Sequence, residues 1–155
     1  PAQFDYHEIG AEQAGLLVRA EHPLANLENV NLEDTVDLQW ISQPRESFMR
    51  QALERLFYSR GIAPPQRMIN TESFSASIGI AAGIDAIVPV PLLIVDLLDP
   101  QRFKMLRIRD QLMLESYGLI KLRKRALSPA AKLVFDAMMR FGVTSSRPAA
   151  ESETA

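Results

Sequence analysis

The stretch at residues 70–91 constrains the fold most, because it contains a short run with the character of a buried strand. Residues 84–90 are mostly β-branched and nearly uncharged, which is typical of a parallel strand covered on both faces. Upstream, apolar side chains recur at helical spacing after Thr71 or Ser73, either of which can cap a helix, and Gly83 suits a left-handed helix end. A strand that feeds a helix start exposes free N–H groups at the sheet edge where α/β proteins bind ligands.

Strands and helices alternate along most of the chain, so we predict an α/β fold with a largely parallel sheet. The other predicted strands are residues 15–20, 38–42, 67–70, 103–109 and 116–122, the other helices are residues 46–60 and 128–141, and short turns or helices fall at 31–34 and 92–98. The helix at 46–60 carries an apolar stripe, places Arg50 and Glu54 on the surface and ends at Gly61. Gly142 is expected to end the last helix, and residues 143–155, rich in Ser, Pro, Ala and Glu, to form a disordered tail.

Composition narrows the class of protein. The chain has 155 residues, enough for one domain or two small lobes, and its 47% hydrophobic content can sustain a packed core. A net charge of -2 argues against duplex binding by this segment alone, and the absence of cysteine excludes disulfides and thiolate chemistry. There is no signal-peptide pattern and no apolar run of about 18 residues. A cytoplasmic protein without a membrane segment is therefore expected.

A set of short motifs follows one another between residues 4 and 142. They are residues 17–25 (Leu-Val-Arg-Ala-Glu-His-Pro-Leu-Ala), 32–34, 40–44 before a helix, 52–55 running to 61–65, 71–73, 84–89 and 127–131. In this order and spacing they resemble the C-terminal part of a LysR-type transcriptional regulator. The resemblance covers about the last half of a family member, and the helix-turn-helix domain, its linker helix and most of the first lobe have no counterpart here.

The resemblance implies a fold similar to that of type II periplasmic binding proteins, whose two α/β lobes are joined by two crossing strands and bind an effector between them. On this basis residues 1–19 are an N-terminal segment with the first crossing strand, 20–110 the second lobe, 111–142 the second crossing strand with the last helix of the first lobe, and 143–155 a tail. Because most of the first lobe is absent, exposed apolar surface is expected around Leu133, Val134 and Met138, and with it self-association or pairing with a partner.

Two helix starts are the candidate ligand sites, one in residues 42–47 and one in residues 70–73. Each combines N–H groups, small hydroxyls and the positive end of a helix dipole, which suit a carboxylate or a similar anion. By resemblance the 42–47 loop lines the effector site, whereas helix capping alone would also explain Ser47 and Ser73, and Arg45 is either an anion partner or a surface residue. The predicted effector-binding residues are Ser42, Gln43, Pro44, Arg45, Ser47, Phe48, Thr71, Glu72, Ser73, Pro89 and Tyr117.

The sequence shows no constellation typical of catalysis or of a metal site. His7 and His22 are the two histidines, and neither has a second histidine at ligand spacing. Asp85 lies inside the apolar run and is expected to be paired near a lobe boundary. Phosphate-loop, dinucleotide-binding and nucleophile-elbow motifs are absent, so we expect no enzyme, no metal and no cofactor.

The function predicted from these observations is that of an effector-sensing fragment of a LysR-type regulator, which binds a small, anionic metabolite. Two alternatives stay open: a solute-binding protein of the same fold, and a truncated regulator that acts through oligomerisation without binding DNA. The expected partners are a small-molecule effector and further copies of the chain, as a dimer or tetramer. DNA would be bound only through an N-terminal domain that this chain lacks.

Overall fold

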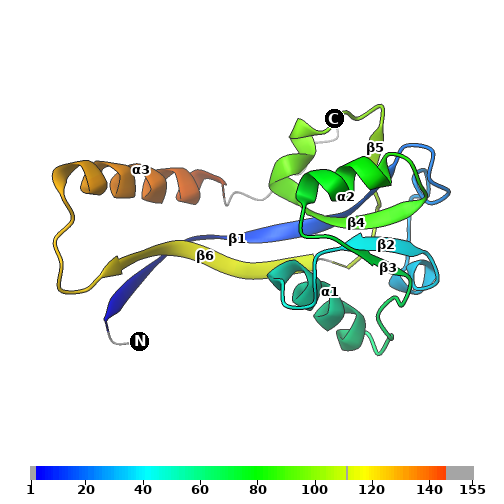
Figure 1. Cartoon of the computed structure of the whole chain (residues 1–155), viewed down its shortest axis with the longest axis horizontal. Coiled ribbons are helices and arrows are strands. Elements are labelled where there is room, and N and C mark those ends of the chain that lie inside the picture. The colour runs from blue at the N-terminus through cyan, green and yellow to red at the C-terminus, as the bar shows by residue number, and fades with distance from the viewer. Residues whose placement is uncertain (1–2, 111, 146–155) are drawn as a thin grey trace, which may run out of the picture. The chain divides into compact units, whose positions relative to one another are not determined.

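The computed structural model describes residues 3–110 and 112–145, which have an α/β fold (Figure 1). These residues form two compact units. Unit 1 holds residues 3–12 and 115–145, and unit 2 holds residues 13–110 and 112–114. The strands are β1 (Phe4–Arg19), β2 (Gln39–Ser42), β3 (Met68–Asn70), β4 (Ala86–Pro91), β5 (Phe103–Met105) and β6 (Leu112–Leu122), the helices are α1 (Phe48–Ser59), α2 (Phe74–Ala81) and α3 (Pro129–Ser145), and the 3-10 helices are η1 (Leu32–Thr35) and η2 (Leu92–Leu97).

The sheet of unit 2 has the strand order β3-β2-β4-β1-β5, and β6 pairs separately with β1. Strand β2 is parallel to β3, with Ser42 opposite Asn70, and parallel to β4, with Trp40 opposite Ile87. Strand β1 is antiparallel to both β4 and β5. The predicted α/β class is therefore confirmed, but the prediction of a largely parallel sheet holds for only three of the strands.

Strand β4 has the buried character that its sequence predicted. All its residues except Pro91 are buried, and successive side chains enter two different apolar clusters. Ile87 packs in the cluster formed with α1, whereas Val88 packs in the cluster formed with α2. Figure 1 shows α1 and α2 on opposite sides of these strands, so the central strand is covered on both faces.

Helix α1 begins and ends at the predicted signals. The Ser47 hydroxyl accepts a hydrogen bond from the Arg50 amide, and Gly61 follows the helix at φ 72°. At this end the Gly61 amide donates to the Tyr58 carbonyl and the Ile62 amide to the Phe57 carbonyl, both at 3.0 Å, which is a Schellman arrangement.

One expectation for α1 was wrong. Arg50 is 6% exposed and pairs with Glu54 at 2.6 Å, so it does not lie on the surface. The helical spacing of this pair is the same for a solvated face and for a face turned toward neighbouring chain, and here the pair lines a groove together with residues 64–66 and β3.

Helix α2 starts where predicted but ends differently. The Ser73 hydroxyl accepts from the Ala76 amide, which makes Ser73 rather than Thr71 the N-cap. Gly83 does not adopt the predicted left-handed conformation, since Gly61 is the one described glycine with positive φ. The C-cap is Ala82, which keeps right-handed helical angles while its amide donates to Ile78, so the helix ends without a left-handed residue.

Several predicted boundaries were also wrong, and the long strands show why. Strand β1 begins at Phe4 rather than residue 15, and β6 begins at Leu112 rather than residue 116, because these strands pair with partners distant in the sequence. Strand β5 ends at Met105, short of residue 109. Helix α3 continues through Gly142, a residue that a helix tolerates at a cost of about 1 kcal/mol. Of the predicted tail, residues 143–145 belong to α3, and the rest lies outside the described residues.

Helix α3 packs on the strands of unit 1 through few side chains. The Phe135 ring meets the His7 ring edge-on, with 5.1 Å between their centroids. Leu133, Val134 and Met138 are 69%, 57% and 45% exposed, which confirms the predicted apolar surface at this helix.

Candidate functional site

The candidate site lies in unit 2, at the carboxyl ends of β2 and β3. Because these parallel strands are neighbours, the segments that follow them start side by side, and the Thr71 amide donates to the Ser42 carbonyl at 3.0 Å. Each segment leads into a helix, whose start is capped by Ser47 or by Ser73. Two helix N-termini are thus held at one edge of the sheet, where their positive dipole ends favour an anionic or hydrogen-bond-accepting group.

Ser42 is the residue of this edge whose hydrogen bonding is incomplete. Its side chain is buried, with 2% of the residue exposed, and its hydroxyl has no partner among the residues that the structure describes. A buried hydroxyl without a partner costs about 1–3 kcal/mol. The fold thus carries a donor that a ligand entering at this edge could satisfy.

The other hydroxyls at this edge are already engaged. Ser47 and Ser73 cap their helices, and the Ser73 hydroxyl also lies 3.0 Å from that of Ser75. The Thr71 hydroxyl accepts from the Ser73 amide at 3.2 Å. Capping therefore accounts for the orientation of these three side chains, and only Ser42 is left without a structural role for its oxygen.

The remaining predicted residues divide by location. Gln43 and Pro44 are half-buried, whereas Arg45, Phe48 and Glu72 are exposed on the segments around the two helix starts. Pro89 is buried in β4 opposite Leu16. Tyr117 belongs to β6 in unit 1 and is 38% exposed. The structure thus brings the segments of Ser42 and Thr71 together, and the effector-binding role of all these residues stays a prediction.

A groove beside the loop was not predicted from the sequence. It encloses 370 Å³ on the side of α1 that faces β3 and the 64–66 connector. Arg50, Glu54 and Tyr58 line it from α1, and Asn70 lines it from β3. The helical spacing of the α1 residues was visible in the sequence, but their position beside the connector was not.

At the opposite end of β4, charged residues form a partly exposed ion pair. Asp85 lies just before the strand rather than inside it, and its carboxylate accepts from Arg19 at 2.7 Å. This hydrogen bond with Arg19 holds the pKa of Asp85 below its ordinary value. His22 is buried and its Nδ1 accepts from the Leu24 amide at 3.1 Å. The two polar groups are thus paired within the turn and strand ends, as structural residues are.

Residues 3–110 and 112–145 contain no group of three or more side chains suited to hold a metal ion. In the same residues, no helix has the length and apolar character needed to cross a bilayer.

Comparisons with known proteins give a consistent result. The family model described as the LysR substrate binding domain matches residues 1–141. The HTH-type transcriptional regulator GbpR of Azospirillum brasilense is 31% identical over 150 residues, which are 96% of this chain and 44% of that protein. GbpR of Rhizobium radiobacter is 38% identical over 90 residues, which are 58% of this chain and 30% of that protein. The chain therefore spans less than half the length of either relative.

Solved structures share the fold. The regulatory domain of CcmR from Synechocystis PCC6803, in complex with 2-PG, has a TM-score of 0.75 at 20% identity and is matched over 90% of this chain and 67% of its own. The effector-binding domain of QuiR in complex with shikimate gives 0.69 at 22% identity, over 92% and 67%. The BenM effector-binding domain with its effector benzoate gives 0.69 at 16% identity, over 96% and 68%.

Proposed function

The chain belongs to the LysR substrate binding domain family, and from this premise we propose that it senses a small anionic effector within a transcriptional regulator. Its matched relatives are named transcriptional regulators, not enzymes. Neighbours of the same fold are described in complex with 2-PG, shikimate or benzoate, and the last two are carboxylates. These neighbours support a small-molecule ligand of this class for the chain.

The observation that carries the proposal is the buried hydroxyl of Ser42. It lies next to the two helix starts, so an effector carboxylate could accept its hydrogen bond and also interact with the positive ends of α1 and α2. The gain would be larger than for an exposed serine, because the hydroxyl has already lost its hydration on folding. Arg45, which is exposed on the same segment, would add charge attraction at the entrance.

We further propose the two-lobe arrangement of the family for the protein that carries this chain. Residues 20–110 would form the second lobe, and the strands near residues 16–19 and 116–122 would cross to a first lobe to which α3 belongs. The limits of unit 2, Gln13–Leu114, support this division. The effector would then bind between lobes and favour the closed state, through contacts present only in that state. Pro89 and Tyr117 are the proposed contributions from β4 and β6.

The proposal for the whole protein follows from its relatives. We propose a cytoplasmic homo-oligomer that binds DNA through a helix-turn-helix domain outside residues 1–155, as the relatives' names indicate for those proteins. The exposed apolar residues of α3 support association with further protein surface. A solute-binding protein of the same fold is the alternative function, and it would bind the same ligand class without any response at a promoter.

The Ser42→Ala variant of the full-length regulator tests the proposal. Ligand binding is followed by thermal shift against benzoate and shikimate and against their neutral amides. We expect the wild type to respond to a carboxylate but not to its amide, and Ser42→Ala to lose about 10- to 150-fold in affinity, since one hydrogen bond to a charged group contributes about 1.5–3 kcal/mol.

The matched control is Ser59→Ala. That hydroxyl lies on the exposed end of α1 and donates to the Leu56 carbonyl, so its loss should leave ligand affinity unchanged. Ser42→Ala should unfold at the same temperature as the wild type or higher, because it removes a buried unsatisfied group. Equal ligand affinity in the wild type and Ser42→Ala would remove Ser42 from the site, and a stronger response to the amides would overturn the anionic class.

A further inference from the structure

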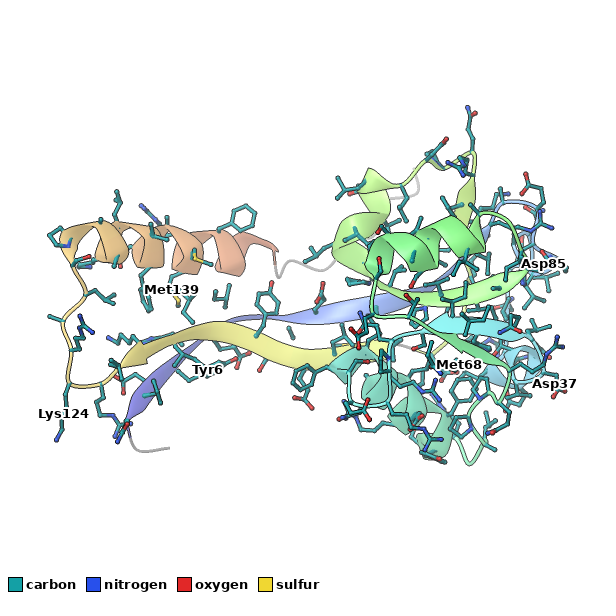
Figure 2. All side chains as sticks on the ribbon, viewed as in Figure 1. Tyr6, Asp37, Met68, Asp85, Lys124 and Met139 are labelled. Atoms are coloured by element: carbon teal, nitrogen blue, oxygen red, sulfur yellow. The ribbon has the colours of Figure 1, made fainter. Side chains whose placement is uncertain are left out.

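A cluster of cations lies where β6 ends and the chain turns into α3. Four of the five residues 121–125 are basic, namely Lys121, Arg123, Lys124 and Arg125, and we call them the basic cluster. All four belong to unit 1, and Figure 2 shows Lys124 on the connection between β6 and α3. The whole chain has a net charge of -2, so this concentration of positive charge runs against its overall balance.

Two members of the basic cluster are engaged within unit 1. Arg123 pairs with Asp5 at 2.8 Å, and its amide donates to the Gln3 carbonyl. The Lys121 ammonium lies 5.9 Å from the centroid of the Phe135 ring. These contacts fix the end of β6 against β1 and α3, so the turn that follows is held on a defined support.

The other two members have no such partner. Lys124 and Arg125 are exposed, and neither side chain has an ion pair or hydrogen bond with any residue in the described part of the chain. Asp5, the acid at this end of unit 1, is already bound to Arg123. Arg123 first, and Lys121 as a smaller influence, hold the pKa of Asp5 below its ordinary value, as expected in a positive local potential.

The surface around the two unpaired cations is concave. A hollow of 500 Å³ is lined by Gln3 and residues 122–125, and a second one of 520 Å³ is lined from Ile120 to Ala131. Both hollows include Leu122 and Arg125. The unpaired charges therefore border recesses into which a convex, negatively charged ridge can fit.

We propose that the basic cluster contacts the phosphate backbone of DNA when the regulator is bound to its site, which rests on the function proposed above. Duplex DNA carries one negative charge per roughly 1.7 Å of axis, and Lys and Arg contacts to it need no particular base sequence. Two unpaired cations can neutralise two phosphates, which gives a modest, salt-dependent addition to the affinity. Exposed acidic side chains of a second copy, such as those of Glu28, Glu33 and Asp37, are the competing occupant.

The test is the salt dependence of DNA binding by the full-length regulator. Fluorescence anisotropy is measured on its own promoter duplex and on an unrelated duplex, for the wild type and for Lys124→Gln/Arg125→Gln. We expect the double variant to lower the slope of log K against log salt by roughly 1–2, since each phosphate contact contributes about 0.9. The loss should be similar on both duplexes, because the contact reads no bases.

The matched control is Arg107→Gln/Arg109→Gln. These two exposed arginines of unit 2 form no ion pair within the described residues, and their loss changes the net charge by the same amount. We expect a smaller change of slope in this control. An equal change in both variants would show a general charge effect and overturn the proposal, as would an unchanged slope in Lys124→Gln/Arg125→Gln.

Two further readouts separate the explanations. If Lys124→Gln/Arg125→Gln dissociates the oligomer in sedimentation without DNA and the slope per bound protein stays constant, the partner is a second copy and the proposal is wrong. Benzoate and shikimate thermal shifts are recorded on the same samples. If Lys124→Gln/Arg125→Gln lowers the salt slope and still responds to ligand as the wild type does, the result supports the role of the basic cluster in DNA binding. If the variant lowers the slope but neither protein responds to any ligand, the effector proposal is refuted and the DNA contact still stands.

Discussion

Unit 2 and unit 1 differ in how their helices place their apolar side chains. In the described residues every buried apolar side chain belongs to unit 2, where α1 and α2 cover the two faces of one sheet. In unit 1, α3 leaves Leu133 and Phe141 exposed at 69% and 77%. A helix normally buries its apolar face against a second layer. Unit 2 therefore has the layers of a self-sufficient core, whereas the apolar face of α3 in unit 1 stays uncovered.

The largest effect is expected from a matched pair of leucines in the two units. Leu53→Ala in α1 removes a side chain that is 1% exposed and should lower the free energy of unfolding by about 2–5 kcal/mol. Leu133→Ala in α3 should change it by less than about 0.5 kcal/mol, because that side chain is already in contact with solvent. Urea unfolding followed by circular dichroism measures both.

The contrast between the buried core of unit 2 and the exposed α3 face of unit 1 is wrong if the two leucine variants lose similar stability. That outcome would mean that the α3 face is covered in solution, by another part of the protein or by a second copy. Repeating the unfolding at several protein concentrations separates the two, since only association between copies makes the midpoint depend on concentration.

A matched pair of glycines gives the next largest effect. A Cβ at Gly118 in β6 would collide with the His7 carbonyl oxygen and lie 2.8 Å from the Tyr6 ring, so Gly118→Ala should destabilise the protein by about 1–3 kcal/mol. A Cβ at Gly79 in α2 meets no atom within 4 Å, so Gly79→Ala should stabilise it by about 0.5–1 kcal/mol.

Hydrogen exchange in the glycine variants also shows which strands are destabilised. Amide hydrogen exchange should quicken in β6 and the early part of β1 in Gly118→Ala, with α1 and β2 protected as in the wild type. Uniform acceleration in both units would show that unit 1 does not open separately, and a stable Gly118→Ala would contradict the close approach of the two strands.

Elements with short-range signals were predicted well from the sequence. Helix α1 has its cap at Ser47 and its stop at Gly61, and β4 has its apolar run, because each signal acts on a neighbouring backbone group. The extent of β1 could not be predicted, since it depends on pairing with three strands distant in the sequence. The same limit applies to Arg50, which is buried and lines a groove with residues 64–66 and β3, chain that follows the helix.

The candidate site shows the same division. Sequence patterns identified the two helix starts, because capping residues and strand ends are local features. That the Ser42 hydroxyl is left without a partner depends on which atoms surround it after folding, so no spacing in the sequence could indicate it. Tyr117 was included through the resemblance alone, and its role stays a prediction.

The smallest expected effect is a pH dependence that reports on the closed core of unit 2. Burial lowers the pKa of His22 below its ordinary value of 6.5, and its neutral Nδ1 accepts the Leu24 amide. A lowered histidine pKa means that the folded state binds fewer protons than the unfolded one, so this part of the stability is present above about pH 6.5 and is lost as the pH falls toward the pKa of the folded state.

His22→Gln keeps an acceptor oxygen but does not titrate. We expect the stability difference between wild type and variant, followed by the fluorescence of Trp40, the single tryptophan, to shrink on acidification. A difference that stays constant from pH 7.5 to pH 5.5 would show that His22 is solvated and that unit 2 is less closed at this turn than its packing indicates.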